Sequence, residues 1–253
     1  MKKAKKKVNA AILVIGNEIL SGRTQDLNVS FISNWLNFKC GIKVEEVRIV
    51  PDIEKIIVSN VLNLSKRFNY VFTTGGIGPT HDDITAKSIS KAFKVKYEYH
   101  KEAYKILENY YSKNNFNEGR KKMARMPEGV KLIHNPLTFA PGYQIENVFV
   151  LPGVPAIMEK MFFNVLDKIQ KGFSKKIITV NTNLFESIIA IDLEKIQKKY
   201  KKCSIGSYPY FYFDKKKGGV NIVISSWEME NIQEVVDEIK NMIRLKGGKS
   251  SLV

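Results

Sequence analysis

The fold is decided by the segment Thr73-Thr74-Gly75-Gly76-Ile77-Gly78-Pro79-Thr80-His81-Asp82-Asp83-Ile84-Thr85. This segment joins a β-prone apolar run, residues 70–72, to a helical pattern of apolar residues that ends at Phe93. Its glycines have no side chain, so backbone N–H groups can approach an anion closely and positive φ angles cost little. A helix that begins just after the turn adds the positive end of its dipole. The pattern therefore favours an anion site of the size of a phosphate group.

Two carboxylates, Asp82 and Asp83, stand at the end of this turn. Carboxylates repel a phosphate unless a cation lies between them, so the pattern predicts a divalent metal (Mg²⁺, Mn²⁺ or Co²⁺) beside a phosphorylated ligand. The turn is neither a Walker loop nor the glycine fingerprint of dinucleotide-binding folds. Two simpler interpretations stay open: Gly-Gly-x-Gly is also ordinary turn chemistry, and Thr80 with Asp83 has the spacing of a capping box.

Strand and helix patterns alternate up to about residue 93. Strands are expected over residues 9–15, 44–50 and 70–74, and helices over residues 27–38, 53–65 and 84–93. That alternation is typical of an α/β fold with a mostly parallel sheet flanked by helices. Ligands in such sheets bind at the carboxyl ends of the strands, where both Gly16 and the glycine turn would lie. Further helices are expected over residues 102–112 and 118–126, the second ending at Pro127.

A shift in composition at residues 171–176 indicates a domain boundary. We expect a basic N-terminal tail (residues 1–7), a main domain (residues 8–172), a small α+β domain of order βαββα (residues 173–246) and a C-terminal tail (residues 247–253). The small domain contains an aromatic run, residues 208–213. Such a run can stack RNA bases. Without an accompanying basic motif, we instead expect alternate rings in the core and the others at an interface.

Four motifs in order resemble the molybdopterin-binding (MoaB/Mog-like) family, in particular its CinA-like branch and the N-terminal region of eukaryotic FAD synthase. They are Ile15-Gly16-Asn17-Glu18-Ile19-Leu20-Ser21-Gly22, the glycine turn, Pro127-Glu128-Gly129 with Ala140-Pro141-Gly142-Tyr143, and Leu151-Pro152-Gly153-Val154-Pro155. The resemblance covers about residues 8–170 and implies a MoaB/Mog-like fold, and residues 173–246 resemble the middle region of FAD synthase. Neither the amidohydrolase domain of longer CinA proteins nor the nucleotidyltransferase domain of FAD synthase fits in 253 residues, so we expect a short form.

The resemblance also implies a set of functional residues. The expected catalytic acids are Asp83 and Asp52, and the expected metal ligands are Asp82, Asp83, Glu18 and Asp26. The expected ligand-binding residues lie in loops that follow strands: Gly16, Ser21, Gly22, Asn28, Thr74, Gly75, Gly76, Gly78, Pro79, Thr80, Pro152, Gly153 and Pro155. Simpler roles stay open, because Asp82 and Asp52 suit helix caps and Asn28 suits a residue that fixes its loop. Asn17 stands where this branch more usually has Asp, which removes one charge from the metal site.

Three functions follow from the resemblance. The first is metal-dependent hydrolysis of a nucleotide pyrophosphate such as ADP-ribose or FAD. The second is molybdopterin binding or adenylylation in cofactor biosynthesis. The third is a ligand-binding or scaffold protein without turnover. In each case the partner is a small nucleotide- or pterin-like molecule. The first is preferred because the motifs that begin at Asn17 and Leu151 are those of the CinA-like side.

Composition excludes several other classes. The formal net charge is +16, yet only six of the 41 basic residues are arginines and the lysines are scattered, so we expect no specific nucleic-acid binding. No apolar run reaches 18 residues, so no membrane partner is expected. The two cysteines, Cys40 and Cys203, lack metal-ligand spacing and indicate reduced thiols in a cytoplasmic protein. We also expect a homo-oligomer.

Overall fold

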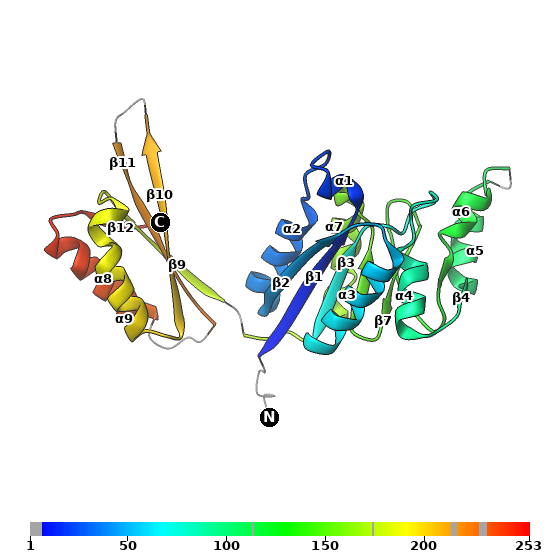
Figure 1. Ribbon diagram of the computed structural model, residues 1–253, viewed down its shortest axis with the longest axis horizontal. Coiled ribbons are helices and arrows are strands. Elements are labelled where there is room, and N and C mark those ends of the chain that lie inside the picture. The colour runs from blue at the N-terminus through cyan, green and yellow to red at the C-terminus, as the bar shows by residue number, and fades with distance from the viewer. Residues whose placement is uncertain (1–6, 113, 174, 214–216, 228–231) are drawn as a thin grey trace. The chain divides into compact units, whose positions relative to one another are not determined.

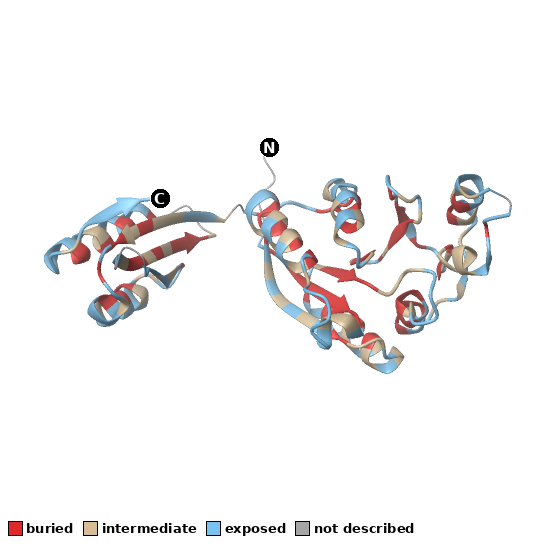
Figure 2. Ribbon diagram, turned by 90° about the horizontal axis from the view of Figure 1, so that it is seen from above, coloured by how far each residue is buried: buried red, intermediate tan, exposed pale blue. Residues whose placement is uncertain are grey.

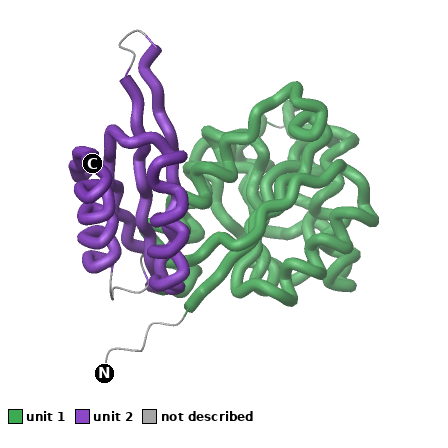
Figure 3. The backbone as a smooth tube through the Cα atoms, turned by 60° about the vertical axis from the view of Figure 1, so that its left-hand side comes forward, with its two compact units in different colours: residues 1–172 green, residues 173–253 purple. Residues whose placement is uncertain are grey.

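The chain forms two compact units, residues 1–172 and 173–253, in this computed structural model (Figure 3). The structure describes residues 7–112, 114–173, 175–213, 217–227 and 232–253. The expected basic tail therefore lies outside the described residues except for Lys7, and Lys215 and Lys216 lie outside them too. None of the helices in the described ranges is long and apolar enough to cross a membrane.

The first unit is built on a six-stranded sheet of order β2-β1-β3-β8-β7-β6. Its strands are β1 (Val8–Ile15), β2 (Ile42–Val50), β3 (Tyr70–Thr74), β6 (Lys131–Ile133), β7 (Gly142–Ile145) and β8 (Val148–Leu151). Strands β2, β1, β3 and β8 are parallel to one another, and β7 and β6 add antiparallel pairs at one edge. The expected α/β fold with a mostly parallel sheet is confirmed.

Helices cover both faces of this sheet (Figure 1). One face packs against α2 (Asn28–Asn34) and α7 (Pro155–Phe163), and the other against α3 (Glu54–Arg67) and α4 (Thr85–Phe93). Alternate residues of β1 supply the two cores: Ala10, Ile12 and Val14 on the first face, and Ala11, Leu13 and Ile15 on the second. Because both faces are covered, the central strands β1, β3 and β8 are buried along nearly their whole length rather than alternating between buried and exposed residues (Figure 2).

The four parallel strands end at the same level. Ile15 pairs with Val50, Val14 with Thr74, and Thr74 with Leu151, so the loops that follow β1, β2, β3 and β8 meet at one edge of the sheet. The order also reverses here, because β2 lies on one side of β1 and β3 on the other. This is the switch point at which ligands bind in open α/β sheets. All four loops contain residues that the sequence singled out.

The remaining elements of this unit are shorter. They are α1 (Asn17–Leu20), a π-helical segment (Trp35–Cys40), β4 (Tyr97–Tyr99), α5 (Lys101–Tyr110), α6 (Glu118–Lys122), β5 (Arg125–Pro127) and a 3₁₀ turn (Leu166–Lys168). The expected helix over residues 27–38 continues instead as π-helix to Cys40, where Gly41 adopts a left-handed conformation and ends it.

The expected helix over residues 118–126 is too long. Helix α6 stops at Lys122, and residues 125–127 pair with β4 as an antiparallel strand. Pro127 disfavours helical backbone in the residue before it, and the guanidinium of Arg125 stacks on the rings of Tyr97 and Tyr99 at 4.6 and 5.3 Å. Long-range pairing therefore decides this segment against its local helical pattern.

The second unit has a four-stranded sheet of order β10-β11-β9-β12 with two helices packed on one face. Its elements are β9 (Lys176–Thr182), α8 (Glu186–Lys199), β10 (Cys203–Tyr212), β11 (Lys217–Ser226), α9 (Ile232–Leu245) and β12 (Ser250–Leu252). The expected βαββα order is followed by one more strand, because β12 pairs with β9 inside the segment that was expected to be a C-terminal tail.

The aromatic run of β10 is not in the core. Tyr208, Phe211, Tyr212 and Phe213 are all exposed, and Tyr210 is half-buried. Strand β10 is the edge strand of its sheet and pairs only with β11 among the described residues. The core of this unit comes instead from β9, β11, α8 and α9. The expectation that alternate aromatic rings are buried was therefore wrong.

The separate cores lead to a first prediction. Ile222 is fully buried in the second unit, so Ile222→Ala should destabilise that unit by about 2–5 kcal/mol and leave the first unit unchanged. Trp35 lies in the first unit and Trp227 in the second, so single-tryptophan variants report each unit by fluorescence during urea unfolding. Ile191→Ala is the control, since Ile191 is 70% exposed and its loss should cost under ~0.5 kcal/mol. Equal destabilisation of both units by Ile222→Ala would contradict two separate cores.

Candidate functional site

The glycine turn is held by backbone geometry that only glycine tolerates. Gly75 and Gly76 have φ angles of +99° and +68°. A Cβ atom on Gly75 would lie 2.1 Å from the carbonyl oxygen of Ile15, and one on Gly76 would lie 2.1 Å from Thr85 Oγ1. Thr85 closes the turn, because its hydroxyl donates to the Gly75 carbonyl at 3.0 Å and its N–H to the Gly76 carbonyl at 3.0 Å. The loop after β3 therefore lies directly against the end of β1.

The loop after β8 joins the same assembly. Gly75 N–H donates to the Leu151 carbonyl at 3.1 Å, and a Cβ atom on Gly153 would lie 3.3 Å from the Gly75 Cα. Asn28, which is buried, donates from Nδ2 to the Gly153 carbonyl at 2.8 Å. This contact gives Asn28 the loop-fixing role that the sequence left open. Its Oδ1 has no hydrogen-bond partner among the described residues, and neither has the buried hydroxyl of Thr74 beside it in the assembly.

Asp82 and Asp83 are both organised by Thr80. The Thr80 N–H donates to Asp83 Oδ2 at 2.8 Å. The Thr80 Oγ1 lies 2.6 Å from Asp82 Oδ1 and 2.5 Å from Asp83 Oδ2, and its single proton can serve only one of them at a time. The hydrogen bond from Thr80 is the main cause that lowers the pKa of Asp82, helped by the nearby charges of His81 and Lys122. Asp82 is therefore ionised at neutral pH.

Gly78 lies against the Asp83 carboxylate. A Cβ atom at Gly78 would be 2.7 Å from Asp83 Oδ2, closer than van der Waals contact allows. The missing side chain of Gly78 therefore leaves the space that this carboxylate occupies. Lys122, the last residue of α6, donates from Nζ to the Thr80 carbonyl and brings a positive charge to the same turn.

Asp52 joins the acids from the loop after β2. Its Oδ2 accepts a hydrogen bond from the Asn17 N–H at 2.9 Å, across two loops. Burial raises the pKa of the Asp52 carboxyl above its ordinary value, the Asn17 hydrogen bond partly opposes this, and the negative charges of Glu18, Asp82 and Asp83 raise it further. Four carboxylates from three loops therefore share one electrostatic environment.

Glu18 is positioned by another glycine. A Cβ atom at Gly16 would lie 2.5 Å from Glu18 Oε1, so the carboxylate folds back over the end of β1. Asp26, in contrast, accepts a hydrogen bond from the Val29 N–H at 2.8 Å, and caps the start of α2 with Oδ1. The acids near Asp52 thus include Glu18, Asp82 and Asp83, while Asp26 has a structural partner of its own.

The chemistry of this donor set suits a hard divalent cation, because carboxylate and hydroxyl oxygens are the ligands of Mg²⁺ and Mn²⁺. The mutual repulsion that raises the pKa of Asp52 is also what a cation would relieve. Within the described ranges, however, no three His, Cys, Asp or Glu side chains are close enough together to hold a metal ion. The acids are gathered but not arranged as a finished coordination shell.

The other expected ligand-binding residues lie at the same edge of the sheet. Ser21 and Gly22 are exposed in the loop after α1, and the Ser21 hydroxyl donates to the Glu18 carbonyl at 3.2 Å. Pro79 is exposed in the turn itself. Pro152 follows β8, and Pro155 begins α7, where its missing N–H costs nothing.

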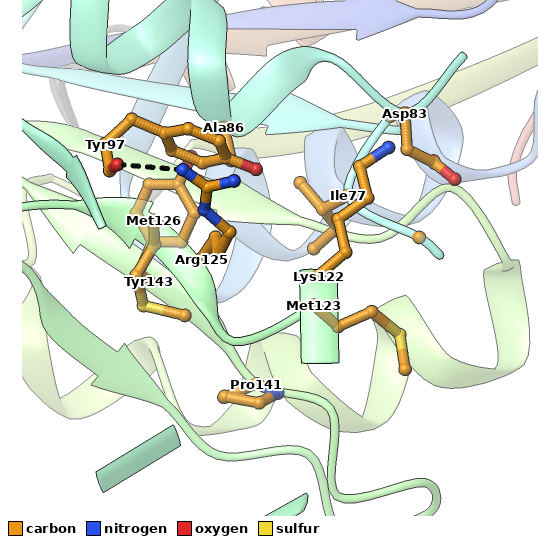
Figure 4. Close-up of a pocket in the computed structure, with 12 residues that line it drawn as sticks. Ile77, Asp83, Ala86, Tyr97, Lys122, Met123, Arg125, Met126, Pro141 and Tyr143 are labelled. Atoms are coloured by element: carbon orange, nitrogen blue, oxygen red, sulfur yellow. Dashed lines mark hydrogen bonds between the residues drawn. The ribbon is translucent and has the colours of Figure 1, made fainter. Parts of the chain in front are cut away.

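The sequence reasoning missed one side of the site. A small cavity opens beside the glycine turn and is lined by residues of α6 and β5 together with Tyr97 and Tyr143 (Figure 4). In this view Asp83 and Lys122 lie on one side, and Tyr97, Arg125 and Tyr143 lie on the other. The cavity measures about 10 Å³, the room of a single water molecule. Its residues come from segments far apart in the chain, so no local spacing connects them to the turn.

Comparison with known proteins agrees with this geometry. Residues 11–171 match the family model of the probable molybdopterin binding domain, and residues 173–247 match the middle domain of FAD synthase. A protein of Archaeoglobus fulgidus is 35% identical over 93% of this chain and 98% of its own length. A CinA-like protein of Sulfurihydrogenibium is 32% identical over 93% of this chain but only 58% of its own length.

A solved structure agrees with the first unit. The protein CinA of Thermoplasma acidophilum, described as of unknown function, is 31% identical and superposes with a TM-score of 0.60 over 64% of this chain and 98% of its own. The fold, the order of the four loops and the family models therefore point to the same assignment. The chain belongs to the family of the probable molybdopterin binding domain, as a CinA-like member of the MoaB/Mog-like proteins that also carries a FAD synthase middle domain.

Proposed function

We propose that this protein binds a phosphorylated nucleotide- or pterin-like molecule at the edge where the four loops meet, and that it hydrolyses a nucleotide pyrophosphate such as ADP-ribose or FAD with a divalent metal. The observation that carries this proposal is the environment of Asp52. Its carboxyl is partly buried beside the glycine turn, and this burial, together with the charges of Glu18, Asp82 and Asp83, raises its pKa. Pairs of acids with pKa values pushed apart are typical of catalytic sites.

In this proposal the acids have two different roles. Asp82 and Asp83, which share Thr80, would hold the metal together with phosphate oxygens of the ligand and water, since Mg²⁺ often takes only one or two carboxylates. The metal would neutralise phosphate charge and lower the pKa of a bound water. Asp52, whose raised pKa makes it a better proton acceptor than an ordinary aspartate, takes a proton from the attacking water. The backbone of the glycine turn and the ammonium of Lys122 face the phosphate.

A non-catalytic ligand-binding or scaffold role is the second candidate. It is supported by the spacing of the acids. In the described parts of the chain, no three of them lie close enough together to hold a metal ion. The remaining candidate is molybdopterin binding or adenylylation, which is supported by the family model that matches residues 11–171. Thermal-shift measurements with nucleotide pyrophosphates and pterins, each with and without Mg²⁺ or Mn²⁺, separate the three candidates.

The location of the protein, its partners and its oligomeric state remain predictions. The proposal places the reaction in the cytoplasm, in keeping with the free, buried thiols of Cys40 and Cys203. Specific nucleic-acid binding is not part of it, since a site edged with four acids repels a polyanion. A homo-oligomer is still expected.

The first test of catalysis is Asp83→Asn. Because Asn keeps the oxygen that accepts from Thr80 but loses the charge, the fold should be retained while metal-dependent hydrolysis of ADP-ribose falls by at least ~100-fold. Formation of AMP and ribose 5-phosphate from ADP-ribose, measured with Mg²⁺ or Mn²⁺ and again with a chelator, reports the hydrolysis. Asp167→Asn, on the 3₁₀ turn after α7, is the charge-matched control and should be fully active. Unchanged turnover in Asp83→Asn, or turnover in chelator, would remove Asp83 and the metal from the mechanism.

Another prediction concerns Asp52 and the pH dependence of stability. A carboxyl whose pKa is raised on folding binds more protons in the folded than in the unfolded state, so its contribution to stability is lost as pH rises from its unfolded pKa through its folded pKa. Asp52→Asn removes this loss and still accepts from the Asn17 N–H. The metal-free variant should therefore gain melting temperature relative to the wild type at pH 7, but not at pH 3. A variant less stable than the wild type at pH 7 would show that the carboxylate is not under repulsion.

A third prediction uses Gly78. A side chain there collides with the Asp83 carboxylate, and φ at Gly78 is not in the left-handed region, so Gly78→Val should move the carboxylate and leave the backbone in place. The thermal shift produced by ADP-ribose with Mg²⁺ should disappear, while the far-UV circular dichroism stays that of the wild type. Gly129→Ala is a poor control because of its positive φ, so Ala156→Val, exposed on α7, serves instead. Equal ligand shifts in Gly78→Val and wild type would mean that the turn does not bind the ligand.

A further inference from the structure

Two residues that line the cavity beside the glycine turn carry buried hydrogen-bond donors without partners. These donors are Arg125 Nε and the Tyr143 hydroxyl, and no donor or acceptor within the described ranges pairs with either. Tyr143 is only 2% exposed. A buried polar group without a partner costs free energy, and most native proteins avoid it, so two on one small cavity require an explanation.

Both groups are fixed in place. The Arg125 guanidinium stacks on the Tyr97 ring with 4.6 Å from Cζ to the ring centroid, and its Nη2 donates to the Tyr97 carbonyl at 3.4 Å (Figure 4). Strand pairing of β5 with β4 holds the backbone of Arg125, and Tyr143 lies in β7 of the central sheet. These contacts hold both residues beside the cavity.

Both groups are also donors at neutral pH. Arg125 is cationic, and the guanidinium N–H groups accept no hydrogen bonds. Burial raises the pKa of the Tyr143 hydroxyl well above its ordinary value, and Tyr97 adds to this, so the hydroxyl keeps its proton. The residues around the cavity therefore carry two unpaired donor groups and a positive charge.

The size of the cavity limits what enters it. Its volume of about 10 Å³ admits one oxygen atom and not a whole phosphate group or ring. The glycine turn and Asp83 form its other wall. An occupant is therefore an atom of something that lies mostly at the turn outside.

We propose that this cavity is a subsite for a single phosphate oxygen of the ligand, which accepts from Arg125 Nε and the Tyr143 hydroxyl. The inference rests on the proposed function, in that the ligand carries a phosphate at the glycine turn. A phosphate oxygen is favoured over a neutral carbonyl because the Arg125 charge and the nearby Lys122 ammonium both attract an anion. Binding would give both orphaned donors an acceptor.

The subsite also gives the site two opposite sides. Arg125 and Lys122 hold the phosphate from the cavity, while Asp83 faces it from the other wall and is grouped with the other three acids, Asp52, Glu18 and Asp82. Asp83 is the only one of those acids that lines the cavity, among the residues described. A phosphate held in this way is kept within reach of the acids although it is repelled by them.

Tyr143→Phe is the most direct test, because it removes one oxygen and keeps the ring. Inorganic pyrophosphate with Mg²⁺ is the ligand used, and isothermal titration calorimetry gives its Kd. Loss of a hydrogen bond to a charged group should raise this Kd about 10-fold or more. The melting temperature of the free variant should equal or exceed that of the wild type, because an unpaired buried group has been removed.

Arg125→Lys is the second variant, since lysine keeps the charge and loses the Nε donor. It should weaken pyrophosphate binding in the same direction. Arg120→Lys is its matched control: the Arg120 guanidinium also stacks on a tyrosine, Tyr111, at 4.1 Å, but does not line the cavity. Tyr70→Phe is the control for Tyr143→Phe, because the Tyr70 hydroxyl accepts from the Gln170 N–H and lies outside the cavity. Both controls should leave the Kd of pyrophosphate unchanged.

Each other result overturns the assignment in its own way. If Tyr143→Phe lowers the melting temperature and leaves the Kd unchanged, the cavity holds a structural water. If the variants weaken riboflavin, which has carbonyl oxygens but no phosphate, and not pyrophosphate, the occupant is a carbonyl. If the wild type does not bind pyrophosphate, there is no phosphate subsite. Hydrolysis is measured separately, so pyrophosphate binding that depends on Arg125 and Tyr143 in a protein without turnover removes the proposed hydrolysis and keeps the subsite.

Discussion

The close approach of three chain segments at Gly75 is the constraint on which the site depends. At this residue the end of β1, the turn after β3 and the loop after β8 lie within van der Waals or hydrogen-bond distance, and a Cβ atom would overlap the Ile15 carbonyl. Only a residue without a side chain and with access to positive φ fits there. The parallel register brings four strand ends to one level, and Gly75 lets their loops close into one surface.

That surface concentrates negative charge at a cost in stability. Asp52 is partly buried among like charges, so its ionised carboxylate is less stable in the folded protein than in water. Thr80 and the Asn17 N–H compensate in part by donating hydrogen bonds to the acids. Conflict of this kind, stabilised by the surrounding fold rather than avoided, is typical of functional sites. The two unpaired donors of Arg125 and Tyr143 also lower the stability of the fold, because a buried N–H group and a buried O–H group lack an acceptor.

The two units have separate hydrophobic cores. In the first, a sheet covered on both faces has mostly apolar central strands, and β1 and β8 are buried almost throughout beneath the loops that follow them. In the second, one face of the sheet packs on α8 and α9 and the aromatic edge strand β10 stays exposed. The family models match the two units with separate domains, in line with their separate cores.

Local chemistry determined much of this protein from its sequence. The alternation of strands and helices, the glycine turn and the helix start at Pro155 all follow from short-range patterns, and they were enough to place the main loops at one edge of a mostly parallel sheet. The tertiary structure alone decided that residues 125–127 form a strand and that Arg125 and Tyr143 meet beside the turn. The physical reason is distance along the chain: those contacts join segments separated by tens of residues, and no pattern within one segment encodes which partner it will meet.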